Sequence, residues 1–259
     1  NGSAPYREVL THGFVVDAEG KKMSKSQGNV VSPIKVMNTL GADVMRLWVA
    51  AADYRGEMSV SDEILKRVSD AYRRIRNTAR LLLGNLDGFD RNHLLEPSEM
   101  LPLDRWAVRR AGALQVEVKL AYENYQFLQV YQKVHNFCAF EMGAFYLDIL
   151  KDRLYTTGYD SLARKSAQTA MYHVLEAMAR WIAPVLSFTA EEIHQFVPGD
   201  RSESVFLETW YENLFEMDDA EAERKRWARV IQVRDAVSKS IEAVRKEGKA
   251  GSSLAVEVE

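Results

Sequence analysis

A stripe of apolar residues at helical spacing runs from Ser61 to about Leu86, and no other feature constrains the fold as strongly. Apolar residues recur every three or four positions, which places them on one face of an α-helix that buries that face. Ser61 can accept a hydrogen bond at the helix start, and Asp62 and Glu63 suit the positive end of the helix dipole. The stripe consists of Ile64, Leu65, Val68, Tyr72, Ile75, Ala79, Leu82, Leu83 and Leu86. The sequence therefore predicts a long amphipathic helix.

Further helical stretches follow this one, separated by short polar turns or by a Gly- and Pro-containing connector. They cover residues 103–122, 127–155, 160–186, 189–197 and 218–246. Pro184 should kink or end the third of them, because proline cannot donate the backbone hydrogen bond that a helix interior needs. Thr189 and Glu192 have the spacing of a capping box. Residues 205–207 and 254–259 read as short extended pieces. Since helices joined by short turns pack side by side, we expect a mainly α fold built as an antiparallel helical bundle.

The first residues of the chain have a different pattern. Residues 9–16 are rich in β-branched side chains, interrupted by Gly13, and predict a strand. A lone strand is not stable, so we expect its partners upstream of residue 1. On that expectation the chain is a fragment of a longer protein.

Two short helices are expected between this strand and the long helix. Ser32 and Pro33 have the pattern of an N-cap with proline at the first helical position, and Gly41 stops that helix. A second helix begins at Asp43. The expected division of the chain is a small α/β connecting segment over residues 1–60, the helical domain over 61–215, and a C-terminal helix with the start of a following subdomain over 216–259.

Residues 19–33 form a basic, hydroxyl-rich loop with no apolar period of its own. Positive charge on a loop of this kind can stabilise a polyphosphate that becomes more negative during a reaction. It is not a Walker-type loop, because Gly-x-x-x-x-Gly-Lys-Ser/Thr is absent. A solvated turn between two elements is the simpler interpretation of such a loop. The side chains concerned are Lys21, Lys22, Ser24, Lys25 and Ser26.

Basic residues accompany the apolar stripe of the long helix. At about 100° per residue, four of them cluster beside the stripe, while Arg67 and Arg74 point further round. Because a solvated face normally mixes both signs of charge, this bias favours contacts with a phosphate backbone. A soluble helix face with no ligand is the alternative. The four candidates for nucleic-acid contact are Lys66, Arg73, Arg76 and Arg80.

The composition excludes several classes of protein. With 259 residues, a formal net charge of −3 and 47% hydrophobic residues, the chain is globular and is not a polycation. Its one cysteine, Cys138, cannot form an internal disulfide, and it lies in an apolar helical pattern that predicts burial. No stretch approaches the length of a membrane span or a signal peptide. We expect a cytoplasmic protein without a membrane partner and without a metal site.

The loop carries a family signature. Lys22-Met-Ser-Lys-Ser26 spells the KMSKS motif of class I aminoacyl-tRNA synthetases. Further segments resemble the bacterial isoleucyl-tRNA synthetases more than their valyl and leucyl relatives. These segments are residues 10–14, 42–50, 53–54, 61–66, 72–78, 145–155, 181–192 and 246–258. The resemblance covers nearly the whole chain.

In that family the loop closes on ATP while the isoleucine carboxylate attacks the α-phosphorus. The resemblance implies that Lys22 and Lys25 are catalytic, neutralising charge on the leaving phosphates, and that Met23, Ser24 and Ser26 complete the ATP-binding loop. ATP would be bound with Mg²⁺ in the longer parent enzyme, and zinc would lie outside this chain. We expect the fragment itself to bind none of these, and the loop to have no fixed arrangement without ATP.

The family's helical bundle binds the anticodon stem and loop of tRNA. The resemblance therefore implies tRNA(Ile) as the partner, isoleucine and ATP as substrates of the parent, and Lys66, Arg73, Arg76 and Arg80 as contacts with the RNA backbone. A monomer is expected. The HIGH signature and the editing domain of the family are missing from this sequence, so the chain alone should be inactive.

Two alternatives remain open at this point. The chain could be a stand-alone tRNA-binding module that kept the synthetase fold without catalysis. It could also be a fragment of a valyl or leucyl synthetase. The reading frame upstream of residue 1 separates the first alternative from an enzyme, and the charging specificity of the intact protein separates the second.

Overall fold

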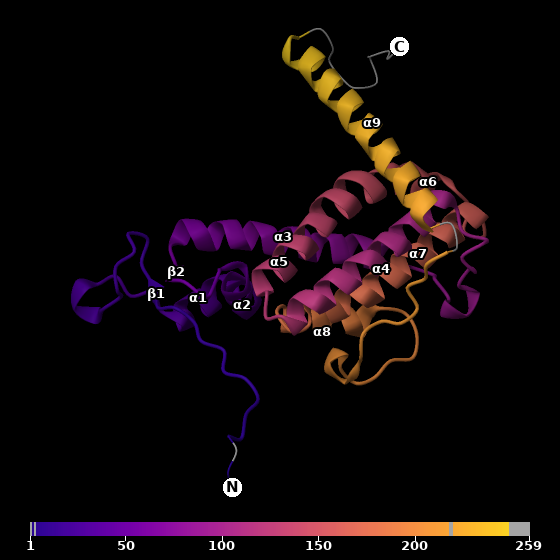
Figure 1. The fold of residues 1–259 in the computed structure, drawn as a ribbon. Coiled ribbons are helices and arrows are strands. Elements are labelled where there is room, and N and C mark those ends of the chain that lie inside the picture. Colours follow the sequence, from indigo (N-terminus) through magenta and orange to yellow (C-terminus); the bar gives the residue numbers. More distant parts are fainter. Residues whose placement is uncertain (1, 3, 218–219, 249–259) are drawn as a thin grey trace. The chain divides into compact units, whose positions relative to one another are not determined.

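The computed structural model describes residues 2, 4–217 and 220–248, and divides into two compact units between Phe215 and Glu216. The first unit contains every strand and helix from β1 to α8, and the second contains α9. Figure 1 shows the long helices of the first unit lying side by side, with the small sheet at one end of α3. The predicted fold class, a helical bundle preceded by a small α/β segment, is confirmed.

The small sheet pairs β1 (Val15–Val16) with β2 (Met58–Ser59) in parallel. The expectation of a strand over residues 9–16 is wrong in its length. That further partner strands lie upstream of residue 1 stays a prediction. Only two residues enter the ladder, and their partner lies 43 positions downstream, reached through the helical crossover that a parallel pair requires. Gly13 fixes this arrangement. Its N–H donates to the Tyr54 carbonyl over 2.8 Å, and a Cβ at Gly13 would lie 1.9 Å from the Gly56 oxygen.

The crossover consists of α1 (Pro33–Leu40) and α2 (Ala42–Ala51). Proline at the first position of α1 and the stop at Gly41, whose φ is 93°, agree with the prediction. The buried face of α2 includes the large apolar side chains of Val44, Leu47 and Trp48. The indole Nε1–H of Trp48 also donates to the Ser59 carbonyl over 3.2 Å, which attaches α2 to β2.

The long predicted helix is α3 (Asp62–Gly84), and its start is as expected. The Ser61 side chain accepts a hydrogen bond from the Ile64 N–H over 3.2 Å. The apolar stripe faces the other helices, with Leu65, Val68, Ile75, Ala79 and Leu82 buried.

The remaining helices complete the bundle. They are α4 (Pro102–Glu123), α5 (Phe127–Asn136), α6 (Asp148–Thr156), α7 (Leu162–Ile182) and α8 (Ser187–Phe196). Helices α4 and α7 pack against each other along the centre, and α7 is buried over most of its length. Trp181 lies in the core with its ring edge-on to Phe137 at 5.6 Å. Cys138 is buried there too, as predicted.

The stretch predicted as one helix over residues 127–155 is divided by a π-helical segment, η3 (Phe137–Leu147), between α5 and α6. Its buried side chains recur at the wider spacing of a π-helix, as in Phe137, Met142 and Leu147. The apolar run itself contains no signal that distinguishes this winding from an α-helix.

The start of α8 differs from the prediction. The helix begins at Ser187, so Thr189 lies inside its first turn and is not an N-cap. Asp43 of α2 supplies the cap instead, because its carboxylate accepts from the Phe188 and Thr189 N–H groups. The prediction that Pro184 kinks or ends the preceding helix is confirmed, since α7 stops at Ile182.

Short 3₁₀ turns complete the first unit: η1 (Lys25–Gln27), η2 (Arg91–His93) and η4 (Val205–Leu207). The last of these replaces an expected extended piece. In the second unit, α9 (Ala220–Lys246) forms as predicted, while the strand expected over residues 254–259 lies outside the described residues. Within the described part of the chain, no helix is both long and apolar enough to cross a lipid bilayer.

Candidate functional site

The base of the lysine loop is closed by a short network of hydrogen bonds. Asp17 accepts from the Lys21 N–H over 2.8 Å and from the Asn29 side-chain amide, also over 2.8 Å. Asn29 in turn accepts from the Ser24 N–H over 2.9 Å. The hydrogen bond from Asn29, followed by that from Lys21, holds the pKa of the Asp17 carboxyl below its usual range. One carboxylate and one amide therefore connect the two ends of the loop.

The tip of the loop is the 3₁₀ turn η1. The Ser24 hydroxyl accepts from the Gln27 N–H over 3.3 Å, and the turn closes at Gly28, whose φ of 69° favours glycine. The Ser24 and Ser26 hydroxyls lie 3.1 Å apart. The expectation of an arbitrary arrangement without ATP is thus wrong, because the chain's own hydrogen bonds define the loop.

The two lysines of the signature lie on the outside of this frame. Lys22 and Lys25 are exposed, and neither makes an ion pair with any residue that the structure describes. Lys22 also forms a bridge to Val16, so its backbone is attached to β1. Two cationic side chains are therefore available to a ligand, on a backbone that is already held in place.

A cavity of about 710 Å³ begins where the loop ends. Residues 28–32, α1 and the first half of α3 line it, and the lining includes the buried apolar side chains of Val36 and Leu65. Its basic lining residues are Lys35, Lys66 and Arg73. Arg73 also pairs with Asp70 at 2.9 Å on the helix surface. A groove of this size and charge can accept a phosphate backbone.

The other two predicted contacts lie elsewhere on α3. Arg76 and Arg80 line a second cavity of about 190 Å³ between α3 and α8. There Arg76 donates to both carboxylate oxygens of Glu192, over 3.1 and 3.2 Å. The exposed ring of Phe196 forms part of the wall. The four basic residues therefore divide between two cavities, two in each.

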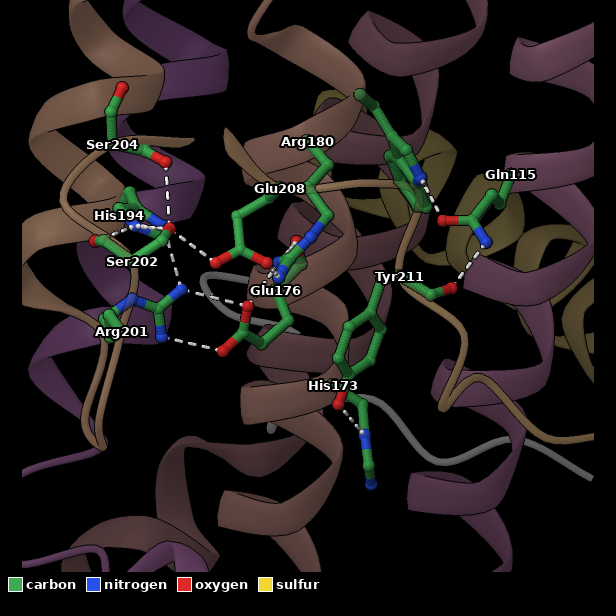
Figure 2. A network of polar contacts seen from close by, with 11 residues as sticks. Gln115, His173, Glu176, Arg180, His194, Arg201, Ser202, Ser204, Glu208 and Tyr211 are labelled. Carbon is green, nitrogen blue, oxygen red and sulfur yellow. Dashed lines mark hydrogen bonds and ion pairs between the residues drawn. The ribbon is translucent and has the colours of Figure 1, made fainter. Parts of the chain in front are cut away.

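A buried ion network was not foreseen from the sequence. Glu176 of α7 lies between Arg180 on its own helix and Arg201, with 2.7 Å from the Arg201 Nη1 to the Glu176 Oε1 (Figure 2). Arg180 also reaches Glu208 at 2.7 Å. Burial alone raises the pKa of Glu176, but the two arginines outweigh it and lower that pKa to about 2. The sequence indicates only the pair of Glu176 and Arg180 within this network, because these residues lie four positions apart on one helix.

The same network fastens the segment that leads out of the first unit. The Gln115 side-chain amide of α4 donates to the Tyr211 carbonyl over 2.7 Å (Figure 2). Its oxygen accepts from the Trp181 indole over 2.9 Å. The Tyr211 hydroxyl lies 2.7 Å from His173 Nδ1, and burial lowers the pKa of His173 to about 4. These contacts hold residues 201–211 on the bundle, which is a structural role.

Arg153 has a similar role at the other end of α7. Its guanidinium donates to the buried carboxylate of Asp104 over 2.7 Å, beside hydrogen bonds from Ser166 at 2.6 Å and Tyr146 at 2.9 Å. Arg153 belongs to a segment that carried the family resemblance. The contact with Asp104 gives Arg153 a role in packing rather than in ligand binding.

Two family models match the chain. The model of class I tRNA synthetases (I, L, M and V) matches residues 1–61, and the model described as the anticodon-binding domain of tRNA ligase matches residues 104–259. The first match contains the lysine loop, and the second contains α7, α8 and the ion network.

Relatives of high identity are isoleucine–tRNA ligases. That of Methylococcus capsulatus is 65% identical over 261 residues, which cover 100% of this chain and 28% of that protein. That of Nitrosococcus oceani is 64% identical over 260 residues, with the same coverage. The chain thus spans little more than a quarter of the length of these relatives.

Solved structures share the fold at lower identity. Agrobacterium radiobacter LeuRS, in a ternary complex with tRNA and LeuAMS, matches with a TM-score of 0.56 and 20% identity over 80% of this chain and 23% of that one. Mycobacterium tuberculosis methionyl-tRNA synthetase, in complex with methionyl-adenylate, matches with a TM-score of 0.55 and 22% identity over 70% of this chain and 36% of that one. These likenesses support the architecture alone.

Proposed function

Because the chain belongs to the family of anticodon-binding domains of tRNA ligases, we propose that it is the part of an isoleucine–tRNA ligase that supplies the ATP loop and the tRNA-binding bundle. The whole reaction would be the ATP-dependent activation of isoleucine and its transfer to tRNA(Ile). The identity of 64–65% to isoleucine–tRNA ligases supports this choice over a valyl or leucyl enzyme.

One observation carries the proposal. Two exposed lysines, Lys22 and Lys25, are held on a closed loop whose end forms the wall of a basic cavity of about 710 Å³. The loop suits the phosphates of ATP, and the cavity suits the backbone of an RNA. A tRNA ligase needs both, since the same protein must bind the nucleotide and the nucleic acid.

The lysines would act on the leaving group. When the isoleucine carboxylate attacks the α-phosphorus, the bond to pyrophosphate breaks and negative charge accumulates on the β- and γ-phosphates. Lys22 and Lys25 would neutralise that charge, with the Ser24 and Ser26 hydroxyls as further donors and Met23, half-buried, holding the turn. The reaction then depends on positioning and charge, without a protein nucleophile.

The bundle would bind the RNA partner. Lys66 and Arg73 would contact the backbone in the first cavity, and Arg76 and Arg80 in the second. The proposed partner is tRNA(Ile), bound by a cytoplasmic monomer. Among the described residues, no group of three or more His, Cys, Asp or Glu side chains could bind a metal ion, so the proposal assigns no ligand of Mg²⁺ or zinc to them.

A hybrid enzyme tests the proposal. In this hybrid ligase, residues 1–259 replace the matching segment of the Methylococcus capsulatus relative, which is 65% identical. The hybrid ligase should charge tRNA(Ile) with isoleucine at a kcat/KM within about tenfold of the unaltered relative, whereas the chain alone should not charge it. An inactive but folded hybrid would contradict the proposal, and it would favour a binding module without catalysis.

A further inference from the structure

Helix α2 carries two charged side chains, three positions apart, that both contact the corner between α7 and α8. The first is Asp43, which is 6% exposed. Its carboxylate accepts from the Thr189 N–H over 2.7 Å, from the Thr189 hydroxyl over 2.6 Å and from the Phe188 N–H over 3.3 Å. These amides belong to the first turn of α8, and the N–H groups of a first turn have no acceptor within their own helix. A negative charge at that end is also favoured by the helix dipole.

The second side chain is Arg46. Its Nε donates to the Val185 carbonyl over 2.9 Å, and its Nη2 donates to the Pro184 carbonyl over 2.8 Å. These carbonyls follow the end of α7. The planar guanidinium donates to both carbonyls at once, and the ammonium group of a lysine cannot reproduce that geometry. The corner is therefore held by a carboxylate on its amides and a guanidinium on its carbonyls.

The other contacts of α2 lead to the lysine loop. Trp48 donates to the Ser59 carbonyl of β2, and β2 pairs with β1. Val16 of β1 then bridges to Lys22, the first lysine of the signature. The Trp48 side chain and the main-chain pairings of β1 and β2 thus connect α2 with the proposed ATP loop.

On the opposite side, α8 is attached to α3. The Tyr72 hydroxyl lies 3.0 Å from the Thr189 hydroxyl, and Arg76 pairs with Glu192. Helices α3 and α8, which line the second cavity, are therefore bound to each other. Asp43 and Arg46 reach the corner between α7 and α8 from α2.

We infer that Asp43 and Arg46 are positioning residues, which keep the tRNA-binding helices in a fixed register with the ATP loop. The inference rests on the proposed function. Arg46 would act through the carbonyls that connect α7 with α8, and Asp43 through Phe188 and Thr189 in the first turn of α8. A tRNA held on the bundle must present its 3′ end to an adenylate formed beside the loop, so an error in this register slows transfer without weakening either binding step.

The kinetic test uses the hybrid ligase with Asp43→Ala and, separately, Arg46→Gln. Pyrophosphate exchange needs only the loop and the catalytic half, and should stay within about twofold of the unsubstituted hybrid. The kcat of tRNA charging should fall at least tenfold, with the Kd for tRNA nearly unchanged. Arg46→Lys should restore part of the loss. Arg55→Gln is the matched control, because Arg55 follows α2 and its ion pair among the described residues is with the exposed Asp53.

A parallel fall in exchange and charging, or no fall in either, would overturn the inference. A second measurement does not depend on activity. Spin labels at Gln27→Cys in the loop and Gln195→Cys on α8 report the distance between these exposed sites, and the native Cys138 is buried. The distance distribution should broaden with Asp43→Ala or Arg46→Gln and stay narrow with Arg55→Gln. Distance distributions of equal width in all variants would contradict the positioning role. This result does not depend on whether the unsubstituted hybrid charges tRNA.

Discussion

The side-chain amide of Asn29 donates to the Asp17 carboxylate over 2.8 Å, and this contact closes the lysine loop across twelve positions of the chain. The same carboxylate accepts from the Lys21 N–H, and the same amide group accepts from Ser24. Lys22 and Lys25 therefore project from a frame whose geometry depends on two residues outside the KMSKS signature.

The first prediction concerns this frame. Asp17→Ala or Asn29→Ala in the hybrid ligase should each lower the rate of pyrophosphate exchange about 10- to 100-fold, because the two lysines lose their placement. The double variant should lose less than the product of the two single losses, since both substitutions break the shared contact between Asn29 and Asp17. Glu19→Gln, in the same turn, is the control and should have little effect. Additive losses in the activation free energy of exchange would show that Asp17 and Asn29 act independently.

The second prediction distinguishes the lysines. Lys25→Ala should lower the exchange rate by about 10²- to 10³-fold, the usual loss for one donor to transition-state charge, while the Kd for ATP rises much less. Lys21→Ala, an exposed lysine outside the signature, should stay near the parent rate. An unchanged exchange rate for Lys25→Ala would remove that residue from the proposed mechanism.

The third prediction concerns the larger basic cavity. Replacing Lys66 and Arg73 together by Gln should lower the affinity of the chain for tRNA and reduce the slope of log K against log salt by about 1 for each lost phosphate contact. Replacing Arg67 and Arg74 together by Gln is the matched control, because these residues lie on the same helix but do not line the cavity. Equal slopes in both double variants would argue against the cavity as the RNA site.

The fourth prediction concerns acid stability. The pKa of Glu176 is about 2 in the folded chain, against 4.5 for an ordinary glutamate. Its ionised form therefore contributes stability that is complete above pH 4.5 and is lost as the pH falls toward 2. A shift of this size corresponds to ~3 kcal/mol as an upper bound. His173, with a pKa of about 4, loses its contribution in the same direction, between pH 6.5 and 4.

The measurement is chemical denaturation of the chain at several pH values. Glu176→Gln should lower the free energy of unfolding much more at pH 7 than at pH 3, because the parent has already lost part of the contribution in acid. Glu203→Gln, at an exposed position two residues after Arg201, should change little at either pH. A loss for Glu176→Gln that does not vary with pH would contradict the paired state of this carboxylate.

Local signals were enough to predict most helices. Ser61 at the start of α3, Pro33 at the start of α1, Gly41 at its end and Pro184 after α7 each act within one helical turn of their own position. The KMSKS residues were likewise found from five consecutive positions. Their supporting contact, from Asn29 to Asp17, was not found, because it depends on a side-chain geometry that the spacing does not reveal.

The errors share a physical cause, which is contact between distant segments. Helix α8 begins two residues earlier than Thr189 because Asp43, about 145 positions away in the chain, caps it. The strand β2 has only two residues and exists because β1 lies beside it. The four predicted basic contacts divide between two cavities because α1 covers one part of α3 and α8 covers another.

The most direct test of the central claim is the affinity of the 259-residue chain for tRNA(Ile) and for the same transcript with its anticodon exchanged. If the bundle is the anticodon-binding part of an isoleucine–tRNA ligase, the exchanged transcript should bind at least tenfold more weakly at physiological salt, since base contacts add to those with the backbone. Equal dissociation constants for the two transcripts, measured at the same salt concentration, would contradict the account.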